Sequence, residues 1–313
     1  MNGSRNNMKR RVGIIVAIFF IAFAIALLFQ KTNTNNKNLS ALLLVGTRTA
    51  ATLPELYHNP SKKIRLLLVP GHDNENPGAV FQGLKEADIN ALLAEELQRL
   101  FQKNSKFEVF LARTKNGYAP QFKELFAKQS IGIKQFREYV QYYAKLFQRN
   151  DIVQQKNTNM HSTAKPESAI KLYGINWWAN SNNIDLILHI HFNDYPRKRR
   201  SEGGTYYGFA IYYPESQLPN HDVTKQLAQS LHSYLKRFFI PSNLPKENGG
   251  LVESQELIAT GSFGSLESAA LLIEYAYIYE PILHVEETRE RFIKNLAIRT
   301  YEGIVEYLKT AGK

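Results

Sequence analysis

Three mostly apolar segments of this chain lead into side chains that can bind a metal ion or carry a proton. The segments are residues 66–69 before Pro70-Gly71-His72, residues 186–190 before His191, and residues 270–273 before Glu274. Each segment has the length of a β-strand. In open α/β sheets, ligands bind outside the carboxyl ends of the strands. We therefore expect two imidazoles and one carboxylate to converge in a single crevice.

A fourth polar residue, Glu86, stands just before residues 87–101, whose apolar side chains have helical spacing. Together with His72 and His191 it forms a set of two histidines and one glutamate. This set is typical of catalytic zinc sites that keep one position open, rather than of closed structural sites. The chain contains no cysteine, which excludes disulfides and Cys-ligated zinc. We expect Zn²⁺ as the cofactor, bound by His72, Glu86 and His191.

These residue types suggest one kind of reaction. Zinc lowers the pKa of a bound water to about 7 and polarises a carbonyl group. A further carboxylate must then take the proton of the water and pass it to the leaving amine. We expect Glu274 to be this catalytic base, because burial at the end of an apolar strand would raise its pKa. The combination suits hydrolysis of an unactivated amide.

The composition limits the possible partners. The chain has 313 residues, of which 44% are hydrophobic, and a formal net charge of +11. The apolar content is sufficient for a complete core in one or two domains. The positive charge favours an anionic partner such as nucleic acid, acidic lipid or a cell-wall polymer. No recognised nucleic-acid module accompanies the charge, so we expect no nucleic-acid partner.

The N-terminal region has the pattern of a membrane anchor. Residues 12–29 are uncharged and mostly apolar, and basic residues cluster within residues 1–11. At about 1.5 Å per residue, the run is just long enough to span a bilayer. The positive-inside rule places residues 1–11 in the cytoplasm and the chain after residue 30 outside. We expect an anchor or uncleaved signal followed by a linker over residues 30–60; the alternative is a cleaved signal peptide.

Strand and helix patterns alternate from residue 61 onward. This indicates an α/β fold, a three-layer sandwich with a mostly parallel twisted sheet, in one catalytic domain over residues 61–313. The expected strands are residues 65–69, 107–111, 186–190, 205–213 and 269–273, and the expected helices are residues 87–101, 223–239 and 286–309.

Residues 117–166 interrupt the alternation. Their apolar residues have helical spacing, from Phe122 and Phe126 to Phe136, Val140 and Phe147, and a polar stretch follows. We expect a helical insertion followed by a loop. It would pack beside the zinc cleft as a substrate wall or a lid, or else lie on the far side of the sheet.

The segment around His72 resembles the opening motif of the zinc-dependent N-acetylmuramoyl-L-alanine amidases of the type-3 family, which are cell-wall hydrolases. Residues 69–79 read Val-Pro-Gly-His-Asp-Asn-Glu-Asn-Pro-Gly-Ala. The resemblance implies that His72 is the first zinc ligand and that Glu86, which opens a helix, is the second. It places the third ligand at His191, in a His-Ile-His-Phe-Asn segment, and the catalytic glutamate at Glu274, in a Leu-Ile-Glu segment.

The chain departs from the family motif at several positions near these residues. Val69 replaces an aspartate, Asp73-Asn74 replaces a Gly-Gly pair, and His189 replaces a serine. No departure removes a ligand or the base. Changes around a metal site can nevertheless reduce metal affinity or activity by about 10–100-fold. The motif therefore does not establish the substrate subsite, nor which residues hold the zinc ligands in place.

Each of the four residues taken singly has an ordinary structural explanation, but their joint occurrence in the family order favours a site. His189 points the same way as His191, because residues two apart on a strand share a face. We favour a structural role for His189 over a second metal ligand. Asn193 either binds substrate or simply ends its strand.

The resemblance implies hydrolysis of the amide bond between N-acetylmuramic acid and L-alanine in peptidoglycan. The enzyme would be anchored in the membrane, with its catalytic domain in the periplasm or on the cell-wall side. Its partners would be the glycan and stem peptide, the membrane and an activator protein. The residues alone argue only for zinc-assisted amide hydrolysis. The alternatives are another exported zinc peptidase or carboxypeptidase, or an inactive wall-binding scaffold of the same fold.

Overall fold

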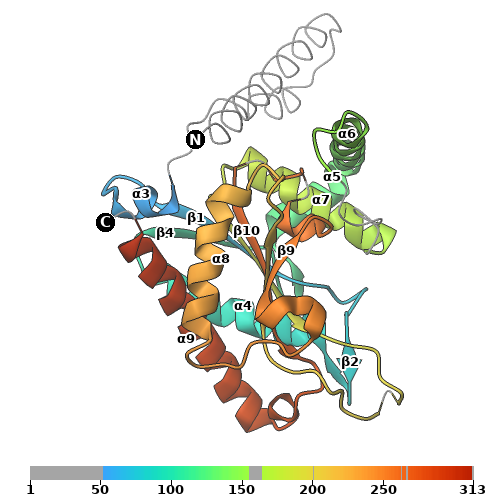
Figure 1. The fold of residues 1–313 in the computed structure, drawn as a ribbon, viewed down its shortest axis with the longest axis vertical. Coiled ribbons are helices and arrows are strands. Elements are labelled where there is room, and N and C mark those ends of the chain that lie inside the picture. The colour runs from blue at the N-terminus through green and yellow to red at the C-terminus, as the bar shows by residue number, and fades with distance from the viewer. Residues whose placement is uncertain (1–51, 155–163, 200, 262, 266, 312–313) are drawn as a thin grey trace, which may run out of the picture. The chain divides into compact units, whose positions relative to one another are not determined.

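The computed structural model describes residues 52–154, 164–199, 201–261, 263–265 and 267–311. Its centre is a six-stranded sheet in the order β4-β1-β7-β10-β8-β9 (Figure 1). The strands are β1 (Ile64–Pro70), β4 (Phe107–Leu111), β7 (Leu186–Asn193), β8 (Ala210–Pro214), β9 (Leu251–Ser254) and β10 (Ala269–Tyr277). β4, β1, β7 and β10 are parallel, whereas β8 is antiparallel to β10 and β9 is parallel to β8. The expected mixed α/β fold with a mostly parallel sheet is confirmed.

Helices lie on both faces of this sheet (Figure 1). On one face, α4 (Glu86–Gln102), α8 (His221–Leu235) and α9 (Glu286–Thr310) share a core with alternate strand residues such as Leu188. On the other face, α5 (Pro120–Lys128) and α7 (Pro166–Ser181) pack on the intervening strand residues, such as Ile187. Strands covered on both faces are near-continuous apolar runs. This is why the central strands could be predicted from the sequence.

The described fold also contains two short hairpins and three 3₁₀ turns. The hairpin of β2 (Val80–Phe81) and β3 (Leu84–Lys85) runs directly into α4, so that Glu86 is the first residue of that helix. A second hairpin joins β5 (Arg113–Thr114) and β6 (Gly117–Tyr118). The 3₁₀ turns are η1 (Pro245–Gly250), η2 (Ile258–Thr260) and η3 (Pro281–Leu283).

Some boundaries differ from the predicted ones. β8 covers residues 210–214 rather than 205–213, and α8 covers 221–235 rather than 223–239. β9 was not predicted at all. It lies at the edge of the sheet and its residues are partly or fully exposed, so it has no apolar run to mark it. Its position depends on pairing with β8.

The predicted insertion contains two helices, α5 and α6 (Ser130–Arg149), and α7 follows it. Figure 1 shows the three helices grouped together. The ring centroids of Phe122 and Trp178 lie 4.8 Å apart, and those of Phe136 and Tyr173 lie 6.2 Å apart. The insertion is therefore held to α7 by aromatic packing. Residues 155–163 of the predicted loop lie outside the described residues.

Helix α3 (Leu53–His58) lies within the stretch expected to be a linker. Thr52 and Glu55 form a capping box, and Leu53 and Leu56 are buried in the core. The folded domain therefore includes residues before 61. The predicted cytoplasmic segment and anchor, residues 1–29, lie outside the described residues. Within the described part of the chain, no helix has the length and apolar character needed to cross a bilayer.

Candidate metal centre and active site

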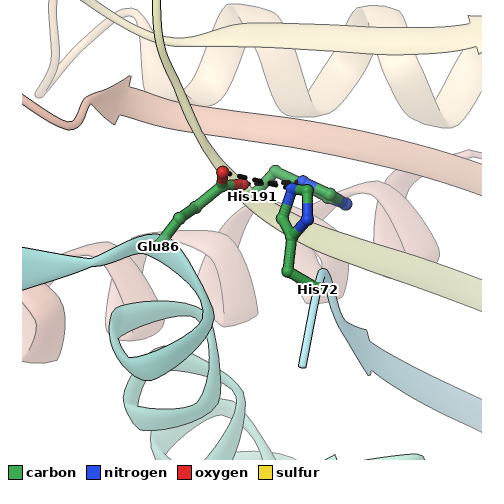
Figure 2. Close-up of side chains that lie close together, drawn as sticks. All are labelled: His72, Glu86 and His191. Atoms are coloured by element: carbon green, nitrogen blue, oxygen red, sulfur yellow. Dashed lines mark hydrogen bonds and ion pairs between the residues drawn. The ribbon is translucent and has the colours of Figure 1, made fainter. Parts of the chain in front are cut away.

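The three predicted metal ligands lie together at the carboxyl end of the sheet (Figure 2). Nε2 of His72 lies 3.1 Å from Oε2 of Glu86, and Nδ1 of His191 lies 2.9 Å from Oε1 of the same carboxylate. One nitrogen or oxygen atom from each residue lies within 4.8 Å of the other two. His72 follows β1, Glu86 begins α4 and His191 lies on β7. Three elements that are distant in sequence thus deliver one compact donor set.

Two glycines make room for this set. A Cβ atom at Gly71 would lie 2.1 Å from Nε2 of His191. Gly78 has a φ of +73°, and its Cβ would lie 2.4 Å from Oε2 of Glu86. His72 itself has a φ of 63°, which is uncommon for a residue with a side chain. The Pro-Gly-His and Pro-Gly-Ala segments are therefore required by the close approach of the three side chains.

A buried arginine, Arg113, holds the two loops that carry these ligands. Its guanidinium donates to the carbonyl oxygens of Pro70 at 3.2 Å, Gly71 at 2.6 Å and Ala87 at 3.0 Å. The Nδ2 atom of Asn90 also donates to the Gly71 carbonyl, at 3.0 Å. The sequence analysis assigned no role to Arg113 or Asn90. A charged residue two positions after a predicted strand was the only local signal for Arg113.

The charges of the site suit a metal ion. Burial opposes ionisation of Glu86, but hydrogen bonds with His191 and His72 hold its pKa well below the usual range. Burial lowers the pKa of His191, which favours the neutral ring. Ionised carboxylates and neutral imidazoles are the forms that bind metals. Two nitrogen donors and one oxygen donor, packed against two obligatory glycines, fit a zinc ion with one open position.

Glu274 lies next to this set on β10, where it pairs in register with His191. Its Oε2 atom is buried, and no described residue forms a hydrogen bond with it. Burial raises the pKa of Glu274 well above its ordinary value, and the negative charges of Glu86 and Glu247 add to this effect. A carboxyl group with a raised pKa beside a metal-binding set can accept and release a proton during a reaction.

Residues 66–306 match the family model described as N-acetylmuramoyl-L-alanine amidase. The chain belongs to this amidase family. It hydrolyses the amide bond between N-acetylmuramic acid and L-alanine in peptidoglycan, and it acts outside the cytoplasm, where peptidoglycan lies. The family and activity predicted from the motif are confirmed.

A solved structure of another amidase shares the fold. CwlD from Clostridioides difficile, solved in complex with the GerS lipoprotein, has a TM-score of 0.52 and 17% identity, covering 79% of this chain and 98% of that chain. The catalytic domain of CwlV from Bacillus (Paenibacillus) polymyxa var. colistinus has a TM-score of 0.47 and 17% identity, covering 79% and 98%. No curated protein is significantly similar in sequence to this amidase.

A cavity of about 620 Å³ opens beside the donor set of the amidase. His72, His191 and Glu274 line one side of it. Residues of α7, together with Tyr118 and Lys165 from the predicted insertion, line another. The two ends of the predicted insertion therefore reach the cavity, whereas no residue of its helices α5 and α6 lines it.

The amidase ties this side of the cavity to the loop that carries His72. Nζ of Lys171, on α7, donates to Oδ2 of Asp73 at 2.6 Å and to Oε2 of Glu75 at 2.7 Å. The Tyr118 hydroxyl also donates to Asp73, at 3.2 Å. Burial alone would raise the pKa of Asp73, but the bond from Lys171 lowers it below its ordinary value. Asp73, which replaces the first glycine of the family's Gly-Gly pair, is thus bonded to Lys171 and Tyr118 in this amidase.

Two other predicted positions have distinct surroundings. His189 is fully buried, lines the cavity and has no hydrogen-bond partner among the described residues. Burial, with the nearby His191, lowers its pKa to about 3. Asn193 donates from Nδ2 to Oε1 of Glu247 at 2.7 Å, and the Tyr212 hydroxyl donates to the same oxygen. The sequence analysis missed Glu247, a buried carboxylate with no local signature.

Proposed function

We propose that this amidase is a single-zinc hydrolase in which His72, Glu86 and His191 hold the metal ion. The observation that carries the proposal is the convergence of one atom from each of these side chains next to Glu274. The donor types and the low pKa of Glu86 support it. When bound, zinc supplies a Lewis acid that lowers the pKa of water to about 7 and polarises the scissile carbonyl.

Glu274 is the proposed catalytic base. Its partnerless Oε2 atom accepts a proton from the attacking water, while the oxygen of the water bonds to the carbonyl carbon of the lactyl group. The same oxygen then gives the proton to the amide nitrogen of L-alanine as the C–N bond breaks. Burial raises the pKa of Glu274, which makes its carboxylate a stronger base for the first of these transfers.

Asn193 is proposed to contact substrate. One of the two Nδ2 hydrogens is donated to Glu247, so a second N–H and the side-chain oxygen remain for a ligand. A donor group of the substrate, such as an amide N–H, would meet the oxygen. The buried carboxylate of Glu247 keeps the amide in this orientation.

We also propose a membrane-anchored arrangement, with residues 1–11 in the cytoplasm and residues 12–29 in the bilayer. Residues 30–60 would connect the anchor to the catalytic domain, residues 61–313, with α3 already packed on that domain. The basic cluster ahead of an uncharged apolar run supports this topology. Fractionation of cells that express the full chain and a chain lacking residues 12–29 tests it: only the full chain should sediment with membranes.

An activator protein is a further part of the proposal. CwlD, which shares the fold, was solved with the GerS lipoprotein. If the present amidase also needs a partner, the purified chain should digest peptidoglycan slowly and an envelope extract should accelerate it. Equal rates with and without the extract would remove the activator from the proposal.

The decisive experiment replaces Glu274 with glutamine in the full chain. Loss of a general base lowers turnover by about 10²–10⁴-fold, whereas Glu274→Gln should keep bound zinc, since Glu274 is not a ligand. Digested peptidoglycan is analysed by mass spectrometry for intact stem peptides with a free N-terminal alanine, and zinc by atomic absorption. Glu286→Gln, at an exposed glutamate on α9, is the matched control.

Four outcomes would contradict the assignments. Zinc loss in Glu274→Gln makes Glu274 a ligand, and near-normal turnover removes it from the mechanism. Full zinc retention in His72→Ala or His191→Ala removes that residue from the metal site. Release of shortened peptides instead of intact stem peptides supports a zinc peptidase.

A further inference from the structure

The cavity beside the proposed metal ligands has an apolar half. Its floor is one row of the sheet, in which Val69, His189 and Leu272 are partners across β1, β7 and β10. Its walls come from α7 and from the segment around η2: Leu172, Ile175 and residues 257–259. This half lies directly below His191 and Glu274, which are two residues further along the same strands.

Several polar side chains at the rim of this cavity are paired with one another. Lys171 donates to Asp73 and Glu75, and Tyr118 donates to Asp73. Lys165 reaches the side-chain oxygen of Asn76 at 3.5 Å. A ligand in the apolar half would therefore find few free hydrogen-bonding groups at the rim.

Two side chains in the cavity keep buried polar atoms without a partner among the described residues. They are His189, at both ring nitrogens, and Glu274, at Oε2. Leaving such groups unpaired destabilises a fold, and native structures contain few of them. The proposed proton transfer explains why Glu274 is in the cavity. The reaction at the metal does not explain why His189 is there with both ring nitrogens lacking a described partner. A ligand that bonds to its ring would supply that explanation.

We propose that the apolar half of the cavity receives the peptide side of the scissile amide, with His189 as hydrogen-bond partner of its first peptide group. The inference rests on the proposed hydrolysis at the adjacent metal set. A neutral imidazole offers one donor and one acceptor that point away from each other, so one of its nitrogens would bond to the C=O or the N–H of that peptide group. The methyl group of L-alanine suits walls made of leucine, isoleucine and alanine.

The glycan fits this half of the cavity poorly. A sugar ring carries several hydroxyl groups, and each loses water partners when it enters an apolar site. The two nitrogens of His189 cannot satisfy them, and Lys171, Tyr118 and Asp73 at the rim are already paired. The geometry therefore sets the direction of the substrate: the stem peptide lies under α7, and the glycan lies outside this half.

The first test replaces His189 with phenylalanine in the full chain, which keeps an aromatic ring, of larger size, and removes both nitrogens. The KM for a soluble muramoyl peptide should rise about tenfold, as expected for one lost hydrogen bond. Bound zinc and kcat should stay close to wild type. The Tm should be unchanged or higher, because two partnerless buried atoms are removed. His189→Gln, which keeps a donor and an acceptor, should recover part of the affinity.

The second test fills the cavity and measures binding without turnover. Leu172→Trp places a large ring in the apolar half, and Ser181→Trp at the exposed end of α7 is the matched control. Calorimetry with a free stem tripeptide that begins with L-alanine should show about tenfold or greater weakening in Leu172→Trp and His189→Phe only. Binding of the N-acetylglucosamine–N-acetylmuramic acid disaccharide should be the same in all four proteins.

The outcomes separate this inference from the proposed function. Peptide binding needs no turnover, so a failure of Glu274→Gln to lose activity overturns the mechanism and leaves the peptide subsite standing. Unchanged peptide affinity in both variants, selective loss of disaccharide binding, or no peptide binding by wild type overturns the subsite. A lower Tm in His189→Phe with an unchanged KM makes His189 a purely structural residue.

Discussion

At the scale of single residues, the peptide unit between Gly71 and His72 decides where the first proposed ligand points. The Gly71 carbonyl accepts hydrogen bonds from Arg113 and Asn90. The N–H of Gly71, in the preceding peptide unit, donates to the Ile190 carbonyl at 2.8 Å. These bonds hold His72 at a positive φ that a histidine rarely adopts. Residues that hold metal ligands in place commonly change metal affinity when they are mutated.

Replacing Arg113 with methionine should lower zinc affinity by about 10–100-fold. It should also destabilise the fold by about 1–3 kcal/mol, because buried carbonyls lose their donor. Competition with a fluorescent chelator measures the affinity, and urea unfolding measures the stability. Arg65→Met is the control, since Arg65 bonds to Glu108 and Asn182 away from the ligand loops. Unchanged zinc affinity in folded Arg113→Met would contradict the assignment of Arg113 as a positioning residue.

At the scale of elements, α7 forms a wall of the cleft of this amidase. It packs on α5 and α6 through aromatic side chains and lines the cavity with its other face. Lys171 ties it to the loop that carries His72, through Asp73 and Glu75. The wall of the cleft and the loop that bears the first proposed ligand are therefore mechanically connected.

Replacing Lys171 with methionine should lower the free energy of unfolding by about 1 kcal/mol. The ion pairs are partly solvated, which limits their contribution, but Asp73 itself is buried. Lys128→Met is the control, because Lys128 forms an exposed pair with Glu124 on α5 and should leave stability unchanged. Urea denaturation compares the two variants with wild type. Equal effects of both substitutions would show that the tie between α7 and the His72 loop contributes nothing specific.

At the scale of the whole molecule, the proposed ligands come from three elements that meet only when the sheet has formed. His72, Glu86 and His191 follow or belong to β1, α4 and β7. The unfolded chain has no preformed site, so the free energy of metal binding adds to the free energy of folding. Zinc binding and domain stability should therefore change together.

Removal of zinc with a chelator should lower the Tm of the full chain, and restoring zinc should raise it. At a zinc concentration of about 100 times Kd, the stabilisation is about 2.7 kcal/mol, or roughly 5–10 °C for a domain of this size. Differential scanning calorimetry measures the change. Glu86→Ala should remove the response, and Mg²⁺ should not replace zinc, because nitrogen ligands do not suit it. A zinc response that survives in Glu86→Ala would place the metal elsewhere.

Local patterns in the sequence determined the parts of this protein that depend on burial and on motifs. β1, β7 and β10 are apolar because helices cover both faces of the sheet, so their positions were predicted within a few residues. The amidase motif predicted which residues meet at the carboxyl end of the sheet, because a parallel sheet gathers the ends of its strands.

Only the tertiary structure decided the rest. Arg113 contacts carbonyl groups up to 43 residues away in the chain, and Lys171 contacts an acid 98 residues away. β9 is defined by pairing with β8. The surroundings of the buried Glu247 are defined by four donors from separate parts of the chain: Asn193, Tyr212, Ser242 and Tyr277. Contacts of this kind leave no local periodicity, since they depend on which surfaces meet after the sheet forms. The motif was enough to predict a zinc amidase. The proposal that the stem peptide lies under α7 needed the folded chain, because the cavity is formed by distant segments.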